Sequence, residues 1–262
     1  MSIIVYLVLG ACAGLIAGLF GLGGGVIIVP VLIFAFGLLK FPADVLVHLA
    51  VGTSLATIII TSSSSVLAHH KRRAISWPVV KQMSIGIIIG TWLGAFAADY
   101  ISGPALQKLI GVFSLCVALQ MALNLKPSAA RKLPNKWGQS VAGTIIGSIS
   151  SLFGIGGGSL SVPFLSYCSV AMPNAVATSS ALSLPIAISG TLGHIYSGWN
   201  STQLPEYSLG YLYLPAWLGI ILTSALFAKL GAKLAHQLPP IVMKRLFATI
   251  LTLVAIKFLF FS

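Results

Sequence analysis

Two glycine clusters stand in nearly the same sequence context and could bind an anion. Residues 18–30 read GLFGLGGGVIIVP and residues 151–163 read SLFGIGGGSLSVP, an offset of 133 positions. Three consecutive glycines let a chain turn tightly and let a ligand approach the backbone. A short helix beginning at such a turn offers free N–H groups and the positive end of its dipole. We therefore predict that both turns line one site, made of Gly23, Gly24, Gly25, Gly156, Gly157 and Gly158.

A second repeated element carries hydroxyl groups. AVGTSLA at 50–56 matches AVATSSA at 175–181, an offset of 125 positions, so that Thr53 aligns with Thr178 and Ser54 with Ser179. Hydroxyls near the start of a buried helix can donate to an anion. They can equally bond back to the carbonyl four residues earlier, which leaves a purely structural role open. We predict these four residues as further substrate ligands.

Other titratable residues give weaker signals. His69 aligns with His194 in the second register, and each could carry protons or simply lie at a membrane interface. Asp44 and Asp99 fall at predicted segment ends, where solvation or capping is the default role. The chain has no HExxH motif, no Cys and His cluster and no acid pair in a predicted segment, so we predict no enzyme activity, no metal site and no cofactor.

The elements that position these residues must lie in a membrane. Hydrophobic residues make up 57% of the chain and charged residues 7%, against about 25% charged in a soluble domain. The uncharged run from Met1 to Leu39 is longer than the roughly 20 residues that cross a bilayer. The sequence therefore predicts an all-α polytopic membrane protein, with residues 1–262 forming a single transmembrane domain.

The hydrophobic pattern divides the chain into two halves of five segments. The second segment of each half spans only about 13 residues, which is too short to cross a bilayer. We expect the first two segments of each half to form a hairpin that enters the membrane, turns at the glycines and returns. The predicted segments are 2–20, 26–38, 44–68, 79–101, 104–124, 138–155, 159–171, 174–196, 207–229 and 241–260.

The basic residues predict an orientation. Twelve of the 15 Lys and Arg residues fall in or beside the loops at 69–78, 125–137 and 229–245, which places these loops in the cytoplasm and the N-terminus outside. An odd number of segments per half then makes the repeats inverted, with residues 1–126 as repeat one and residues 137–262 as repeat two. The glycine turns would approach each other from opposite faces of the bilayer.

The balance of charged residues limits the kinds of substrate and partner that we expect. The net charge is +12, and the chain has only three acids, none of them in the middle of a predicted segment. Cation transporters usually keep Asp or Glu at membrane depth, so an anion or a neutral solute is the better substrate. We expect a small anion and membrane lipid as partners and no nucleic acid. The sequence does not indicate the oligomeric state. Coupling of transport to protons stays an alternative, although no acid in the predicted core supports it.

These motifs resemble the TauE/SafE sulfite exporter family over essentially the whole chain. The resemblance rests on the paired FG(L/I)GGG turns, the proline five residues after each last glycine, and the A-V-x-T-S stretch that follows each. It implies a permease of the prokaryotic cytoplasmic membrane that moves sulfite or organosulfonates such as sulfoacetate without ATP. On this pattern the glycine turns and the Thr and Ser pairs form the substrate site. The alternative class is an integral membrane assembly or partner protein that transports nothing.

Overall fold

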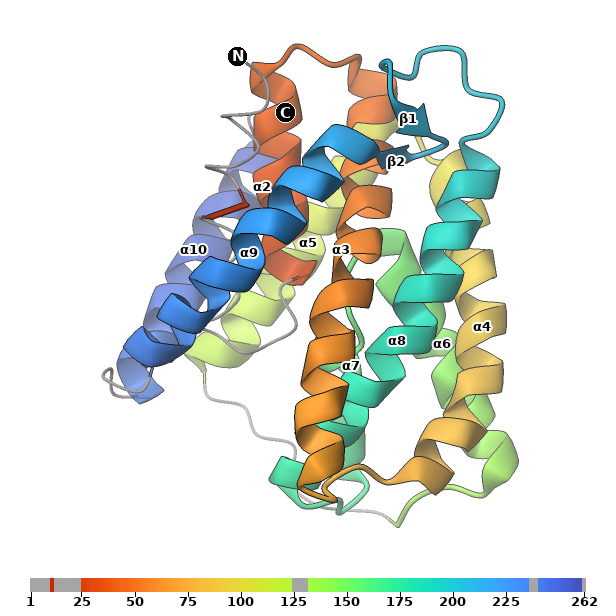
Figure 1. Ribbon diagram of the computed structural model, residues 1–262, viewed down its shortest axis with the longest axis vertical. Coiled ribbons are helices and arrows are strands. Elements are labelled where there is room, and N and C mark those ends of the chain that lie inside the picture. The colour runs from red at the N-terminus through yellow and green to blue at the C-terminus, as the bar shows by residue number, and fades with distance from the viewer. Residues whose placement is uncertain (1–9, 12–24, 124–131, 236–239, 261–262) are drawn as a thin grey trace.

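The computed structural model is a bundle of helices with one short β-hairpin (Figure 1). It describes residues 10–11, 25–123, 132–235 and 240–260. The described elements follow the predicted segments closely, because long apolar runs ending at Gly, Pro or basic residues favour helices with those bounds. They are α2 (Gly25–Leu38), α3 (Ala43–Lys71), α4 (Trp77–Tyr100), α5 (Gly103–Ala122), α6 (Lys136–Phe153), α7 (Gly158–Tyr167), α8 (Met172–Ser197), β1 (Ser208–Leu209), β2 (Leu212–Tyr213), α9 (Leu214–Ala235) and α10 (Pro240–Phe260).

The two ends of the bundle differ in charge. We call the end that carries β1 and β2 the hairpin end, and Figure 1 shows α3 beginning there. All three acids belong to segments at this end: Asp44 begins α3, Asp99 ends α4, and Glu206 precedes β1. The opposite end, which we call the basic end, holds Lys71, Arg72, Arg73, Lys132 and Lys136.

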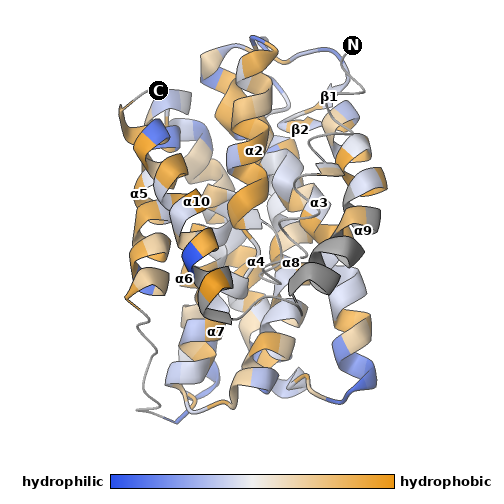
Figure 2. Ribbon diagram, turned by 90° about the vertical axis from the view of Figure 1, so that its left-hand side faces the viewer, coloured by the Kyte–Doolittle hydropathy of each residue, from blue (hydrophilic) through white to orange (hydrophobic). Residues whose placement is uncertain are grey.

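The short helices α2 and α7 occupy opposite ends of the bundle. Both figures show α2 running from the middle of the bundle to the hairpin end, and α7 lying toward the basic end (Figures 1 and 2). With 14 and ten residues, these helices are about 21 Å and 15 Å long at 1.5 Å per residue. Neither is long enough to cross a bilayer of roughly 30 Å.

Among the described residues, four helices are long and apolar enough to cross a membrane, namely α3, α4, α5 and α8. Large apolar side chains also cover the outside of the bundle, among them Phe34, Ile85, Leu93, Leu119 and Leu222. Figure 2 shows this apolar character along most of the helix lengths. Such a surface is stable only in lipid, so the chain is an integral membrane protein.

Glycine stripes bring α4 and α6 into close contact. Gly86, Gly90 and Gly94 of α4 lie against the carbonyl oxygens of Ser140, Thr144 and Ser148 of α6, at positions where a β-carbon would collide with them. Their four-residue spacing puts the three glycines on one face of α4, where they let the two helices pack closely.

The prediction of an all-α chain is wrong for one short segment. Residues 208–213, which the hydrophobic pattern places at the start of a helix, form the antiparallel hairpin β1–β2, with Ser208 opposite Tyr213. Gly210 adopts a positive φ of 53°, which supplies the turn, and the Tyr211 N–H donates to the His194 carbonyl. Because this backbone bond ties the segment to the end of α8, α9 begins only at Leu214.

Candidate functional site

The second glycine turn links α6 to α7 near the middle of the bundle. Helix α6 ends at Phe153 and is capped by Gly154, whose left-handed conformation (φ 65°, ψ 30°) suits a residue without a side chain. Ile155 N–H then closes the helix by donating to Ser150 O at 2.9 Å. The N–H groups of Gly156 and Gly157 have no acceptor among the described residues, so the turn presents free donors where α7 begins.

The first residue of α2 lies directly against this turn. A β-carbon on Gly25 would lie 2.9 Å from both the Gly156 nitrogen and the Ile155 α-carbon. The starts of α2 and α7 are therefore in backbone contact, which only a glycine permits. Gly23 and Gly24, the other predicted residues of the first turn, lie outside the described residues.

Two buried hydroxyls lie beside Gly157. Ser161 Oγ of α7 and Ser183 Oγ of α8 are 3.1 and 3.5 Å from the position that a β-carbon on Gly157 would occupy. Ser161 is fully buried, and its hydroxyl has no hydrogen-bond partner among the described residues. Ser183 donates to Ser179 O at 3.0 Å, and a hydroxyl oxygen that donates can still accept a hydrogen bond. Burying a hydroxyl without a hydrogen-bond partner costs folding free energy, so the Ser161 hydroxyl is a candidate to bind a ligand.

The structure places the four predicted Thr and Ser residues in different surroundings. Ser54 Oγ donates to Gly154 O at 2.8 Å, so it touches the glycine turn. Thr53 Oγ1 accepts from Tyr213 N–H and Thr178 Oγ1 from Ser76 N–H, each at 3.0 Å. Ser179 Oγ is buried and has no partner among the described residues. Only Ser54 is thus seen in contact with the described glycine turn.

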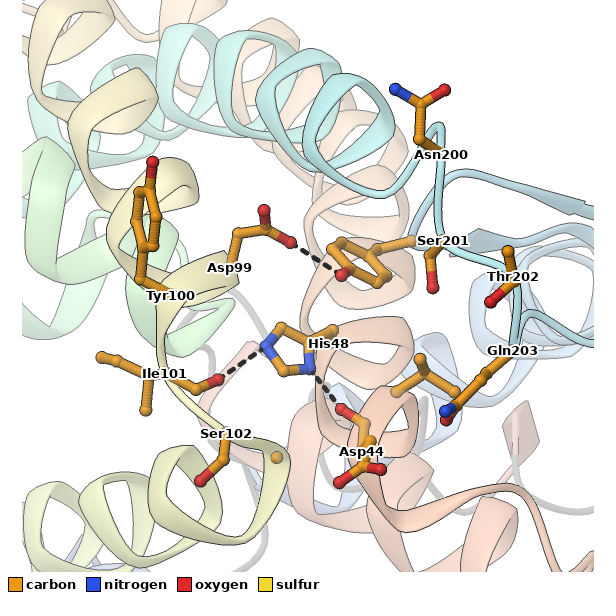
Figure 3. A pocket seen from close by; sticks show the side chains of 13 residues that line it. Asp44, His48, Asp99, Tyr100, Ile101, Ser102, Asn200, Ser201, Thr202 and Gln203 are labelled. Carbon is orange, nitrogen blue, oxygen red and sulfur yellow. Dashed lines mark hydrogen bonds between the residues drawn. The ribbon is translucent and has the colours of Figure 1, made fainter.

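A separate polar pocket opens at the hairpin end. It has a volume of about 490 Å³ and is lined by the ends of α3 and α4, the start of α5 and the loop after α8, including Asp44, His48, Asp99, Asn200 and Tyr211. Figure 3 shows His48 at its centre, between Asp44 and Ile101. Tyr211 OH donates to Asp99 Oδ1 at 2.7 Å. Burial, together with that hydrogen bond, raises the pKa of Tyr211, so the phenol stays a donor at neutral pH.

The predicted histidines do not share one environment. His194 is buried, and its Nε2 lies 3.0 Å from Ser151 O, close to the second glycine turn. His69 lies near the other end of the bundle, in the last turn of α3. Within the described part of the chain, no group of three His, Cys, Asp or Glu residues could hold a metal ion.

Sequence reasoning missed three of these residues. Ser161 and Ser183 align with Ile28 and Ile58 in the two registers, and this change from apolar to polar was the available signal. His48 has no histidine counterpart in the second half and lies in an apolar stretch, so nothing in its local pattern marked it.

Comparison with known proteins gives the class. The chain is 37% identical over 256 residues to a probable membrane transporter protein of Haemophilus influenzae, covering 97% of both chains. It is 30% identical to one of Methanocaldococcus jannaschii, over 89% of this chain and 86% of that one. It is also 31% identical to one of Bacillus subtilis, over 89% and 91%. No solved structure matches the chain.

An apolar helical bundle with relatives of this kind is a membrane transporter protein, a class distinct from enzymes. The family profile described as sulfite exporter TauE/SafE matches residues 6–258. The chain belongs to the TauE/SafE sulfite exporter family, as its paired glycine turns indicate.

Proposed function

We propose that this protein is a secondary transporter of small anions, with sulfite or an organosulfonate such as sulfoacetate as its substrate class. The observation that carries the proposal is the glycine turn at 154–158, where the N–H groups of Gly156 and Gly157 and the hydroxyl of Ser161 all lack a partner among the described residues. Such a site suits an oxyanion, because it offers donors without a negative charge. All three acids belong to segments at the hairpin end, away from this turn. The family name supports the sulfur anions.

The proposed transport mechanism is alternating access by two inverted halves, residues 1–126 and 137–262. Equivalent contacts in the two halves support it. Thr53 accepts from the N–H of Tyr213, just before α9, and Thr178 accepts from that of Ser76, just before α4. The opposite directions of α2 and α7 fit the same symmetry.

A second pair of equivalent contacts comes from two glycines at matching positions of the two halves. Gly10 packs against Gly219 and Ile220 of α9, whereas Gly143, 133 positions later, packs against Met83 of α4. In this arrangement, the substrate would reach the site between the two glycine turns alternately from one side of the membrane and from the other.

The proposed orientation places the basic end in the cytoplasm and the hairpin end outside, in the prokaryotic inner membrane. The support is the charge asymmetry between the two ends, because Lys and Arg favour the cytoplasmic side. An anion leaving the cell would then enter the bundle at the basic end.

The test measures uptake of labelled sulfite and sulfoacetate into proteoliposomes that contain only this protein. A β-carbon on Gly156 would lie 3.4 Å from Ser183 Oγ and 3.6 Å from Ile58, so Gly156→Ala fits the fold but fills the space beside the turn. We expect this variant to insert normally and to lose transport roughly tenfold or more, as for a loss of about 1.4 kcal/mol of binding.

Gly37→Ala is the matched control, because nothing lies within 4 Å of its β-carbon position. It should transport like the unchanged protein. Full transport by Gly156→Ala would contradict the site. Absence of flux for every anion tested, from folded and inserted protein, would favour the alternative class, a non-transporting assembly or partner protein.

A further inference from the structure

Two buried histidines of this chain differ in what their ring nitrogens face. His194 has a carbonyl oxygen, that of Ser151, at Nε2 only, and its Nδ1 has no partner among the described residues. A neutral imidazole, with one N–H, satisfies this arrangement.

His48, by contrast, faces carbonyl oxygens on both sides of its ring. Its Nδ1 is 2.9 Å from Asp44 O, and its Nε2 is 2.9 Å from Ala98 O and 3.2 Å from Ile101 O. A carbonyl oxygen can only accept, so each nitrogen must donate for all of these contacts to be hydrogen bonds. Only the imidazolium form carries an N–H on both nitrogens. His48 as a whole is 3% exposed, so these carbonyl oxygens are the acceptors that its ring nitrogens face.

The surroundings of His48 suit a positive charge. The Tyr211 ring lies 4.9 Å from the His48 ring, within cation–π range, and its hydroxyl donates to the Asp99 carboxylate. The titratable groups that face His48 are Asp44 from α3, Asp99 from α4 and Tyr211 from the hairpin, with His194 of α8 on the far side of Tyr211. The start of α5 contributes Ser102 and Gly103, which do not titrate.

We propose that His48 is a proton-binding site at the hairpin end, where the bound proton lets the ring donate both to the α4–α5 turn and to Asp44 O in the first turn of its own helix, α3. This inference rests on the proposed transport function for its consequence, which is control of transport by pH on that side. His48 is one of the residues that line the polar pocket at the hairpin end (Figure 3). Loss of the proton leaves one carbonyl facing a ring lone pair, so as pH rises the ring keeps its bond either to the α4–α5 turn or to the first turn of its own helix, but not both.

This contact can matter for transport because both partners are parts of the moving bundle. Asp44 begins the helix that carries Ser54, the residue bound to the glycine turn. Ala98 and Ile101 end α4, which packs along α6, the helix that leads into that turn. The protonated ring therefore bonds at the same time to the first turn of α3 and to the end of α4, the two helices that lead to the second turn.

The experiment follows anion flux in proteoliposomes while the pH on the hairpin side is varied from about 5.5 to about 8.5. The unchanged protein should show a roughly tenfold change in flux, as expected for one charge-assisted hydrogen bond. His48→Gln keeps an N–H donor but cannot titrate, so its profile should be flat. His70→Gln is the matched control, since His70 is an exposed histidine at the other end of α3. It should keep the pH response.

A second measurement uses nitrogen NMR of the full chain with labelled histidine. The imidazolium signal of His48 is identified by its absence from the spectrum of His48→Gln. As the pH is raised, this signal should disappear over the same range in which the flux changes. The proposal is overturned if His48 is a neutral tautomer across the whole range, or if His48→Gln keeps the normal pH profile. If the unchanged protein moves no anion at any pH, the transport function fails, while the NMR titration still decides the proton site.

Discussion

Ser54 and Ser161 both lie beside the second glycine turn, but they relate to it in opposite ways. The Ser54 hydroxyl is bonded to the Gly154 carbonyl, and the Ser161 hydroxyl has no partner among the described residues. Removing Ser54 Oγ leaves the buried Gly154 carbonyl without this donor, whereas removing Ser161 Oγ breaks no hydrogen bond among the described residues. Substitution by alanine therefore separates a role in the fold from a role in binding.

Ser54→Ala is expected to destabilise the protein by about 1–3 kcal/mol, because the Gly154 carbonyl loses its donor in a dry environment. Thermal unfolding in detergent measures this as a lower Tm. Ser64→Ala is the control, since Ser64 is exposed and only bonds back to Ile60 O within its own helix. Equal Tm values for the two variants would argue against a structural role of Ser54 at the turn.

Ser161→Ala is expected to give the reverse result. The Tm should stay the same or rise, while the KM for the transported anion should increase roughly tenfold, the effect of one hydrogen bond to a charged group. Concentration-dependent flux and thermal unfolding of the same preparation measure both quantities. A fall in Tm with unchanged KM would show instead that this hydroxyl stabilises the fold.

At the scale of the elements, apolar periodicity and glycine spacing predict most of the helices and their close packing. They fail at residues 208–213, because the hairpin depends on a bond from Tyr211 N–H to the end of α8, and a local pattern does not contain that long-range contact. The glycine turn could be predicted because its sequence is duplicated. The positions of Ser161 and Ser183 beside Gly157 could not, because they too depend on contacts between distant segments. The surroundings of His48 could not be predicted either, because the three carbonyl oxygens that face its ring come from two segments about 50 residues apart.

Close packing of α4 on α6 can be tested at Gly90. A β-carbon there would collide with the Thr144 carbonyl of α6, and backbone cannot move aside as a flexible side chain can. We expect Gly90→Ala to destabilise the protein by about 1–3 kcal/mol through overpacking. Gly37→Ala, whose added methyl meets nothing, serves as the control in the same unfolding measurement. Unchanged stability of Gly90→Ala would contradict the close approach of these helices.

For the whole molecule, charge and symmetry lead to one arrangement. A group of basic residues that includes Lys71, Arg72 and Arg73 lies at one end, and all three acids belong to segments at the other end, where Lys40 also lies. Helices α2 and α7 lie toward opposite ends. With the basic end in the cytoplasm, the pocket around His48 opens to the outside, and α7 lies on the cytoplasmic side of the glycine turn. The proposed proton site and the proposed anion site would then respond to different aqueous phases.

This orientation can be tested by cysteine labelling in intact cells. Single cysteines are introduced as Glu206→Cys at the hairpin end and Arg72→Cys at the basic end, both exposed positions, after Cys12, Cys116 and Cys168 are replaced by alanine. A membrane-impermeant thiol reagent should label Glu206→Cys from outside and reach Arg72→Cys only after the membrane is opened, because charged reagents do not cross the hydrocarbon core. The opposite labelling would place the basic end outside and turn the His48 pocket toward the cytoplasm. Its pH response would then have to be sought on the cytoplasmic side.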